Sequence, residues 1–155
     1  MTGENDPTSS GHRNPAGRLF LIPTPLGTDS DPRRVLPPDT LDAIAPLECF
    51  VAENAKSARA FLKGVGTDKP LQSLQIRELN EHTPPEAVAG LLEPLLGGRD
   101  IGLLSEAGCP AVADPGANLV AAAHAAGIRV VPLIGPSSPL LALMASGLDG
   151  QRFAF

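Results

Sequence analysis

The stretch from residue 101 to residue 116 contains the side chains best suited to binding chemistry. An apolar run, Ile101 to Leu104, leads into a loop of small residues that contains Ser105 and Glu106. The loop is expected to close on Asp114-Pro115-Gly116, which has the form of a helix start with an acidic N-cap and Pro at the first helical position. Ligands of open α/β sheets bind at the carboxyl ends of the strands. The loop is therefore a candidate ligand site, with Glu106 as its principal polar group.

Three other apolar runs also end in small or acidic residues. Pro23 to Gly27 contains a single glycine where a dinucleotide fold needs several, and the chain has no phosphate-binding GxxxxGK[ST] motif. The same loop could equally be a rigid proline turn. Glu53 could accept a hydrogen bond from a ribose or could be a solvated carboxylate at a helix start. Ser137 and Ser138 could bind a ligand or cap the helix that follows them.

Five apolar runs alternate with stretches of helical periodicity, which predicts an α/β fold. The expected strands are Leu19–Ile22, Cys49–Ala52, Leu71–Ile76, Ile101–Leu104 and Val130–Leu133. We expect a five-stranded, mainly parallel sheet with helices on both faces, a three-layer α/β/α arrangement. Right-handed crossovers then place the carboxyl ends of the strands, and the loops described above, along one edge.

The residues that begin and end the expected helices are specific. Thr83 and Glu86 form a capping-box pattern with Pro84 at the first helical position, which predicts a helix over Thr83–Leu96 with a kink at Pro94. Asn54 is expected to cap a helix that ends at Gly64. Two further helices, Gly116–Ala126 and Ser138–Ser146, are expected to end at left-handed glycines, Gly127 and Gly147.

Composition narrows the possible partners. The 155 residues carry a net charge of −5 and contain no Trp or Tyr, which argues against a nucleic-acid footprint over the whole surface. Arg33 and Arg34 leave a local basic patch open. Cys49 and Cys109 have no metal-ligand spacing and indicate a reduced, cytoplasmic chain, although Cys109 could be a reactive thiol. Residues 1–17 read as a disordered tail without a signal peptide, and no apolar run is long enough to span a membrane.

Several of these motifs together resemble the tetrapyrrole methylase superfamily. Thr24-Pro25-Leu26-Gly27, Ala52-Glu53, Leu104 to Gly116 and Gly135-Pro136-Ser137 occur in the order that this superfamily shows. The closest resemblance is to the branch of ribosomal RNA small subunit methyltransferase I, which typically reads T-P-I-G-N-L, E-D-T-R, S-D-A-G-T-P with S-D-P-G, and P-G-P-S-A. The similar region runs from about Arg18 to the end of the chain.

The resemblance implies S-adenosylmethionine as the methyl donor, bound without a metal in a cleft between two α/β domains. It implies 2′-O-methylation of a cytidine ribose, with small ribosomal subunit RNA as the partner and with no DNA or membrane partner. Residues 18–155 would form the N-terminal domain, and the C-terminal domain would be absent. A half-cleft with an exposed apolar wall favours a homo-oligomer such as a dimer. The family's donor-contacting positions fall on Pro25, Leu104, Ser105, Glu106, Cys109, Ser137 and Ser138.

The chain departs from the branch at positions near this site. E-D-T-R is replaced by Glu53-Asn54-Ala55-Lys56, H-E-H-N by Arg77-Glu78-Leu79-Asn80, and S-D-A-G-T-P has Glu106 and Cys109 in place of Asp and Thr. A ribose hydroxyl must lose a proton during methylation, and these changes leave the general base unassigned. Two alternatives therefore remain: a tetrapyrrole C-methyltransferase, and a non-catalytic ligand-binding domain of the same fold.

Overall fold

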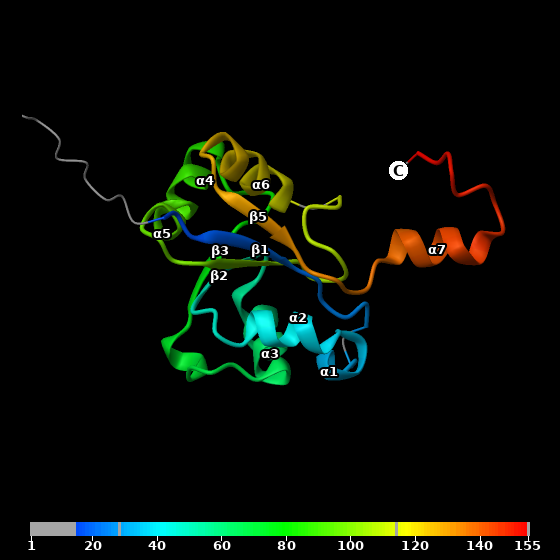
Figure 1. The fold of residues 1–155 in the computed structure, drawn as a ribbon, viewed down its shortest axis with the longest axis horizontal. Helices are drawn as coiled ribbons and strands as arrows, with labels where there is room; N and C mark the ends of the chain where they lie inside the picture. Colours follow the sequence, from blue (N-terminus) through cyan, green and yellow to red (C-terminus); the bar gives the residue numbers. More distant parts are fainter. Residues whose placement is uncertain (1–14, 28, 114, 155) are drawn as a thin grey trace, which may run out of the picture.

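A parallel sheet of five strands forms the centre of the molecule in this computed structural model, which describes residues 15–27, 29–113 and 115–154 (Figure 1). The strand order is β3-β2-β4-β1-β5, and every pair is parallel. The strands are β1 (Arg18–Ile22), β2 (Cys49–Ala52), β3 (Gln75–Glu78), β4 (Ile101–Leu104) and β5 (Arg129–Pro132). The expected mainly parallel five-stranded sheet is confirmed.

Helices cover both faces of this sheet, so the three-layer arrangement is also confirmed (Figure 1). One face packs against α2 (Pro38–Ile44) and α3 (Ala55–Val65), and α1 (Pro32–Val35) packs against the end of α3. The other packs against α4 (Pro85–Leu91), α5 (Glu93–Leu96) and α6 (Gly116–Ala125). The short helices α1 and α2 were not predicted from the sequence.

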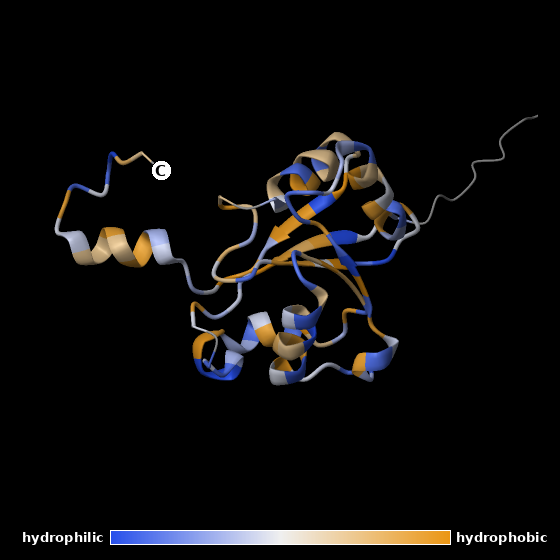
Figure 2. Ribbon diagram, turned by 180° about the vertical axis from the view of Figure 1, so that it is seen from behind, coloured by the Kyte–Doolittle hydropathy of each residue, from blue (hydrophilic) through white to orange (hydrophobic). Residues whose placement is uncertain are grey.

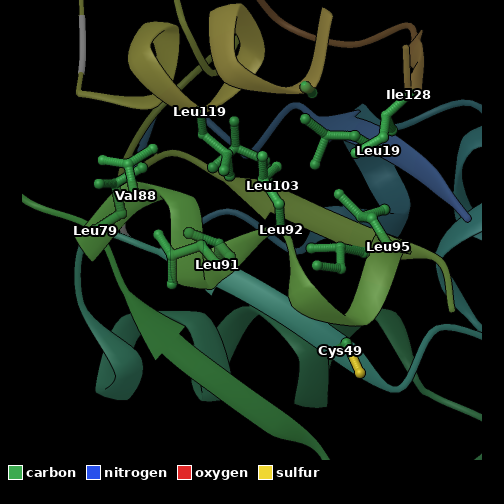
Figure 3. Close-up of a cluster of buried hydrophobic side chains, with 13 residues drawn as sticks. Leu19, Cys49, Leu79, Val88, Leu91, Leu92, Leu95, Leu103, Leu119 and Ile128 are labelled. Carbon is green, nitrogen blue, oxygen red and sulfur yellow. The ribbon is translucent and has the colours of Figure 1, made fainter. Parts of the chain in front are cut away.

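Alternating side chains of β4 divide the hydrophobic core into two clusters. Ile101 and Leu103 pack toward α4, α5 and α6 with Leu19, Leu95 and Leu119 (Figure 3). Leu104 packs toward α2 and α3 in a second cluster that includes Phe50 and Leu62. Both faces of β2 and β4 are buried, which explains why these strands read as continuous apolar runs.

The third predicted strand was misplaced. The apolar run Leu71–Ile76 forms a 3-10 turn, η1 (Leu71–Ser73), and β3 begins only at Gln75. β3 is an edge strand in which Ile76 is half-buried while the other three side chains are exposed. Because an edge strand of this kind is mostly solvated, apolarity did not mark its boundaries.

The predicted helix over Thr83–Leu96 is two helices, and its predicted capping box is wrong. Pro85, not Pro84, begins α4, because the residue before a proline is driven to extended dihedral angles, here φ −67° and ψ 147° at Pro84. The Thr83 hydroxyl instead accepts a hydrogen bond from the Asn80 N–H at 3.0 Å. The helix breaks at Leu92, just before Pro94, because Pro94 has no N–H to donate to the Gly90 carbonyl. The Arg77 guanidinium donates to the Gly90 carbonyl instead, at 2.8 Å.

Most other helix ends agree with the predictions. Asn54 caps α3, and Gly127 and Gly147 have positive φ angles of 70° and 68° after α6 and α7 (Ser138–Ser146). α3 continues to Val65, one residue past Gly64, and Gly66 with φ 83° follows it. The predicted N-cap Asp114 lies outside the described residues.

The two ends of the described chain differ in their packing. Of the predicted tail, residues 1–14 lie outside the described residues, whereas Gly17 is buried and donates its N–H to the Leu95 carbonyl at 2.8 Å. α7 extends away from the sheet, and Figure 2 shows that much of it is hydrophobic. Its residues Leu140, Leu141 and Met144 are exposed. Within the described ranges, no helix is long and apolar enough to cross a membrane.

Candidate functional site

The loops after β1 and β4 are joined at the carboxyl edge of the sheet. Thr24 and Gly108 exchange two backbone hydrogen bonds of 2.9 and 3.1 Å. The Thr24 hydroxyl donates to the Ser105 carbonyl at 3.3 Å, and the Ser105 hydroxyl donates to the Gly108 carbonyl at 2.7 Å. Thr24 is buried, and Gly108 has a φ of 73°, which favours glycine. These contacts hold the two loops in a fixed relation to each other.

The loop after β5 is attached to the same unit by two contacts. The Cys109 thiol donates to the Pro136 carbonyl at 3.2 Å. Gly135 packs so closely on Pro23 that an added Cβ would overlap the proline ring. The three loops that follow β4, β1 and β5 therefore form one continuous surface along the edge of the sheet.

The first turn of α3 is held at the same edge by residues that follow β2 and end β3. The Asn54 carboxamide oxygen accepts the N–H groups of Lys56 and Ser57 at 2.8 and 3.1 Å. The Glu78 carboxylate, at the end of β3, accepts the Ala55 N–H at 2.9 Å. Three N–H groups of the helix start are thus satisfied, and Ser57 is brought to face the loop after β4.

A cavity of about 330 Å³ lies between these loops and α3. Its walls include Pro25 from the loop after β1, Leu104 and Ser105 from the end of β4, and Phe61 from α3. Glu106 also lines the cavity, and the Ser57 hydroxyl lies 2.6 Å from its carboxylate oxygen, a short charge-assisted hydrogen bond. The same hydroxyl lies 3.0 Å from the Asn54 carbonyl. The full set of lining residues is Thr24, Pro25, Gly27, Ser30, Pro32, Ala52, Ser57, Ala58, Ala60, Phe61, Leu104, Ser105 and Glu106.

The seven residues expected to contact a donor separate into two groups. Pro25, Leu104, Ser105 and Glu106 line the cavity, whereas Cys109, Ser137 and Ser138 do not. Cys109 faces the loop after β5, and Ser137 occupies the N-cap position of α7 without a side-chain cap hydrogen bond.

Sequence reasoning missed the wall that α3 contributes. Ser57, Ala60 and Phe61 line the cavity at helical spacings of three and four residues. The Asn54 cap at the end of β2 was the available signal, because a helix that begins at the carboxyl edge of a parallel sheet presents its first turns to that edge.

The charged groups of the cavity differ from those at the opposite end of the sheet. Glu106 is the only ionisable residue among the described residues that line the cavity.

At the amino ends of β1 and β4, Arg18 binds Asp100 through its backbone N–H at 2.6 Å and its guanidinium at 2.7 Å. Partial burial of Asp100 raises its pKa, but the hydrogen bonds and charge of Arg18 outweigh this effect, so that the pKa of the carboxyl lies below its ordinary value. The described residues contain no group of three or more potential metal ligands.

Comparison with known proteins extends the similarity beyond the motifs. Proteins named ribosomal RNA small subunit methyltransferase I from Xylella fastidiosa and from Escherichia coli O157:H7 are 37% and 34% identical to the chain over 139 and 142 residues. A protein of the same name from Synechocystis is 37% identical over 145 residues. These matches cover 90% or more of the chain. No family model matches the chain.

The chain spans about half the length of these relatives, between 46% and 48% of each. The departures from the branch motifs are compatible with the fold: Asn54 caps α3, and Glu78, one of the two residues retained from H-E-H-N, also binds an N–H of that helix. By sequence, the chain is a relative of the ribosomal RNA small subunit methyltransferase I proteins over about half of their length, as its motifs indicated.

Proposed function

We propose that the chain binds S-adenosylmethionine in the cavity beside Glu106 and forms the donor-binding half of an RNA methyltransferase. The acceptor we propose is a cytidine ribose 2′-hydroxyl of small-subunit ribosomal RNA. The observation that carries the proposal is the cavity itself, whose walls include residues of the Thr24-Pro25-Leu26-Gly27 and Leu104-Ser105-Glu106 motifs, in a chain that is similar to methyltransferases over about 90% of its length.

The size and lining of the cavity suit such a donor. Ligand sites are commonly clefts of about 300 to 1,000 Å³ with mostly apolar walls and a few polar groups, and the cavity of about 330 Å³ lies in this range. Phe61, Pro25 and Leu104 provide apolar surface for the adenosine part. Bound S-adenosylmethionine supplies a methyl group already activated on a sulfonium, so the protein mainly has to position it.

Glu106 is the group that we expect to orient the donor. The donor carries a net positive charge, and a carboxylate in a partly enclosed site attracts it more strongly than one in open water. The hydrogen bond from Ser57 restricts the Glu106 side chain to the side of the cavity formed by α3. Holding the carboxylate in place before binding reduces the entropy lost when the donor binds.

Cys109, Ser137 and Ser138 we assign to an outer part of the same site. They lie beyond the cavity, but the contacts of Cys109 with Pro136 and of Gly135 with Pro23 join the loop that precedes Ser137 to the loops that line the cavity. A bound acceptor or the outer end of the donor could therefore reach these side chains.

Calorimetry with S-adenosylmethionine and S-adenosylhomocysteine tests the donor site. Glu106→Gln keeps the shape of the side chain and removes its charge, so we expect the affinity for S-adenosylmethionine to fall about tenfold. Glu86→Gln, on the exposed start of α4, is the matched control and should bind as the unmodified chain does. A larger loss for the sulfonium donor than for the neutral thioether product would place Glu106 near the sulfur, and an equal loss would place it near the amino group.

A steric variant checks the location independently. Ala60→Trp introduces a large ring on the cavity wall at an exposed position of α3. We expect it to abolish donor binding while the thermal unfolding midpoint changes little. Undiminished binding in both Glu106→Gln and Ala60→Trp would show that the donor does not occupy this cavity. The acceptor is tested separately, by measuring transfer of labelled methyl groups to isolated small ribosomal subunits.

A further inference from the structure

Basic residues are concentrated on two neighbouring helices beside the cavity. α1 contains Arg33 and Arg34, and α3 contains Lys56, Arg59 and Lys63, whereas neither helix contains an acidic residue. These five residues, which we call the basic α1–α3 face, are five of the twelve Lys and Arg in a chain of net charge −5. The nearest acid in sequence to α1, Asp31, is used as its N-cap and accepts the Arg33 N–H at 3.0 Å.

The position of this face follows from the helical spacing in α3. Ala58, Leu62 and Val65 are buried in the core, and Ser57 and Phe61 line the cavity. Lys56 and Lys63 are seven residues apart and therefore lie two turns apart on a third, outer side of the helix. This outer side adjoins the cavity wall, because Lys56 directly precedes Ser57 and Lys63 lies beyond Ala60 and Phe61.

α1 packs against the other end of α3. Pro32 packs against Gly64 so closely that an added Cβ would lie 3.0 Å from the proline Cδ. The Arg33 guanidinium donates to the Val65 carbonyl at 3.0 and 3.1 Å, which satisfies an orphan carbonyl near the end of α3. The two helices are thus connected, with basic residues on both.

Three of the five side chains have no internal role in the described part of the chain. Arg33 binds Val65, and Arg59 donates to the Leu71 carbonyl at 3.0 Å. The side chains of Arg34, Lys56 and Lys63 are exposed, and among residues 15–27, 29–113 and 115–154 they make no hydrogen bond or ion pair. Their charges are therefore available to an external anion.

We infer that the basic α1–α3 face holds the phosphate backbone of an RNA acceptor beside the cavity. This inference rests on the proposed methyltransferase function. The donor carries a net positive charge and gains nothing from neighbouring cations, whereas RNA has a phosphate at every nucleotide. On a chain with an overall negative charge, a local basic face also selects the side from which RNA approaches.

Fluorescence anisotropy with a labelled, unstructured oligoribonucleotide of twenty nucleotides tests the inference. The variant Arg34→Ala/Lys56→Ala/Lys63→Ala removes the three unpaired cations and leaves the contacts of Arg33 and Arg59 intact. Each cation that contacts a phosphate of a single strand contributes about 0.7 to the slope of log affinity against log salt. We expect the slope to fall by about 2 and the affinity at 100 mM salt to fall about 100-fold.

A control with the same charge change isolates the effect of position. Arg99→Ala/Arg129→Ala/Arg152→Ala removes three cations from the amino ends of β4 and β5 and from the C-terminal segment, away from the basic α1–α3 face. It should retain the affinity of the unmodified chain within about threefold, and thermal unfolding of both variants checks that the fold is intact.

Three results would overturn the inference. The first is no RNA binding by the unmodified chain, and the second is an equal loss of RNA affinity in the two triple variants. The third, from a parallel titration with polyglutamate, is that Arg34→Ala/Lys56→Ala/Lys63→Ala loses affinity for this acidic peptide but not for RNA. Donor binding, measured separately by calorimetry, distinguishes failure of this inference from failure of the proposed function. RNA binding through the face without donor binding would refute the methyltransferase proposal and leave the face as an RNA-binding surface to which no reaction is assigned. Donor binding with RNA binding that does not depend on the face would refute this inference alone.

Discussion

Replacement of Gly102 by alanine should destabilise the fold, because this glycine lies between large side chains at the centre of the sheet. Gly102 pairs with Phe20 of β1 and Phe50 of β2. An added Cβ would lie 2.5 Å from the Ile22 Cδ1 and 2.8 Å from the Phe50 Cδ1. Both neighbours are almost completely buried, with 0% and 1% of their surface exposed, so neither has space to move into.

The magnitude follows from two opposing effects. Overpacking of a buried site costs about 1–3 kcal/mol. Replacing Gly with Ala also restricts the unfolded chain, which stabilises the native state by about 0.4–1 kcal/mol where the native geometry is compatible. We therefore expect Gly102→Ala to lower the free energy of unfolding by about 1–2 kcal/mol and the unfolding midpoint by several degrees.

Urea unfolding followed by far-UV circular dichroism measures this change, since the chain has no Trp or Tyr for fluorescence. Gly90→Ala in α4 is the control, because its added Cβ would meet no atom within 4 Å apart from its chain neighbours and the backbone of its own helix; it should stabilise the fold by about 0.5–1 kcal/mol. Ile22→Val removes the clashing Cδ1 methyl and costs about 0.5–1.5 kcal/mol alone. The double variant with Gly102→Ala should be about 1 kcal/mol more stable than the sum of the single changes. Additive effects, or a neutral Gly102→Ala, would refute this description of the packing.

Two further predictions concern the ends of the sheet. Asp100→Asn removes the ion pair with Arg18 and should lower the free energy of unfolding at pH 7 by less than about 1 kcal/mol, since both groups are partly exposed. Because the folded-state pKa of Asp100 is depressed, the contribution of the ion pair to stability is complete above the unfolded-state pKa of Asp100 and is lost as the pH falls through the folded-state pKa. Urea unfolding of the unmodified chain and of Asp100→Asn between pH 2 and 7 should show that their free energies of unfolding converge at low pH. A difference that stays constant with pH would contradict this role of Asp100. Asn54→Ala should cost about 1 kcal/mol through loss of the α3 cap, whereas Asn54→Asp should retain most of the stability; equal losses in both would show that the cap hydrogen bonds contribute little.

The elements that could be read from the sequence are those governed by local chemistry or by complete burial. β1, β2 and β4 were located to within a residue because interior parallel strands are covered by helices and read as apolar runs. Edge strand β5 was placed one residue late, at Val130–Leu133, and its two central valines, which are half-buried, supplied the signal. The Asn54 cap and the glycines after α6 and α7 depend on the dihedral preferences and hydrogen-bonding groups of single residues. Edge strand β3 was misplaced because its exposed side chains give no apolar pattern. The start of α4 was misread because Pro85 forces Pro84 into an extended conformation, which overrides the capping pattern.

The order of the strands in the sheet decides which loops line the cavity, and no local sequence pattern encodes this order. β4 lies between β1 and β2, so the Ser105–Glu106 loop comes between the Pro23–Gly27 loop and the start of α3. β5 lies at the far edge beyond β1, which separates Ser137 and Ser138 from α3. Residue types along the chain therefore indicated the edge of the sheet at which the cavity lies. The pairing of strands distant in sequence, driven by burial of both sheet faces, placed Ser57 against Glu106 and left Ser137 and Ser138 outside the cavity.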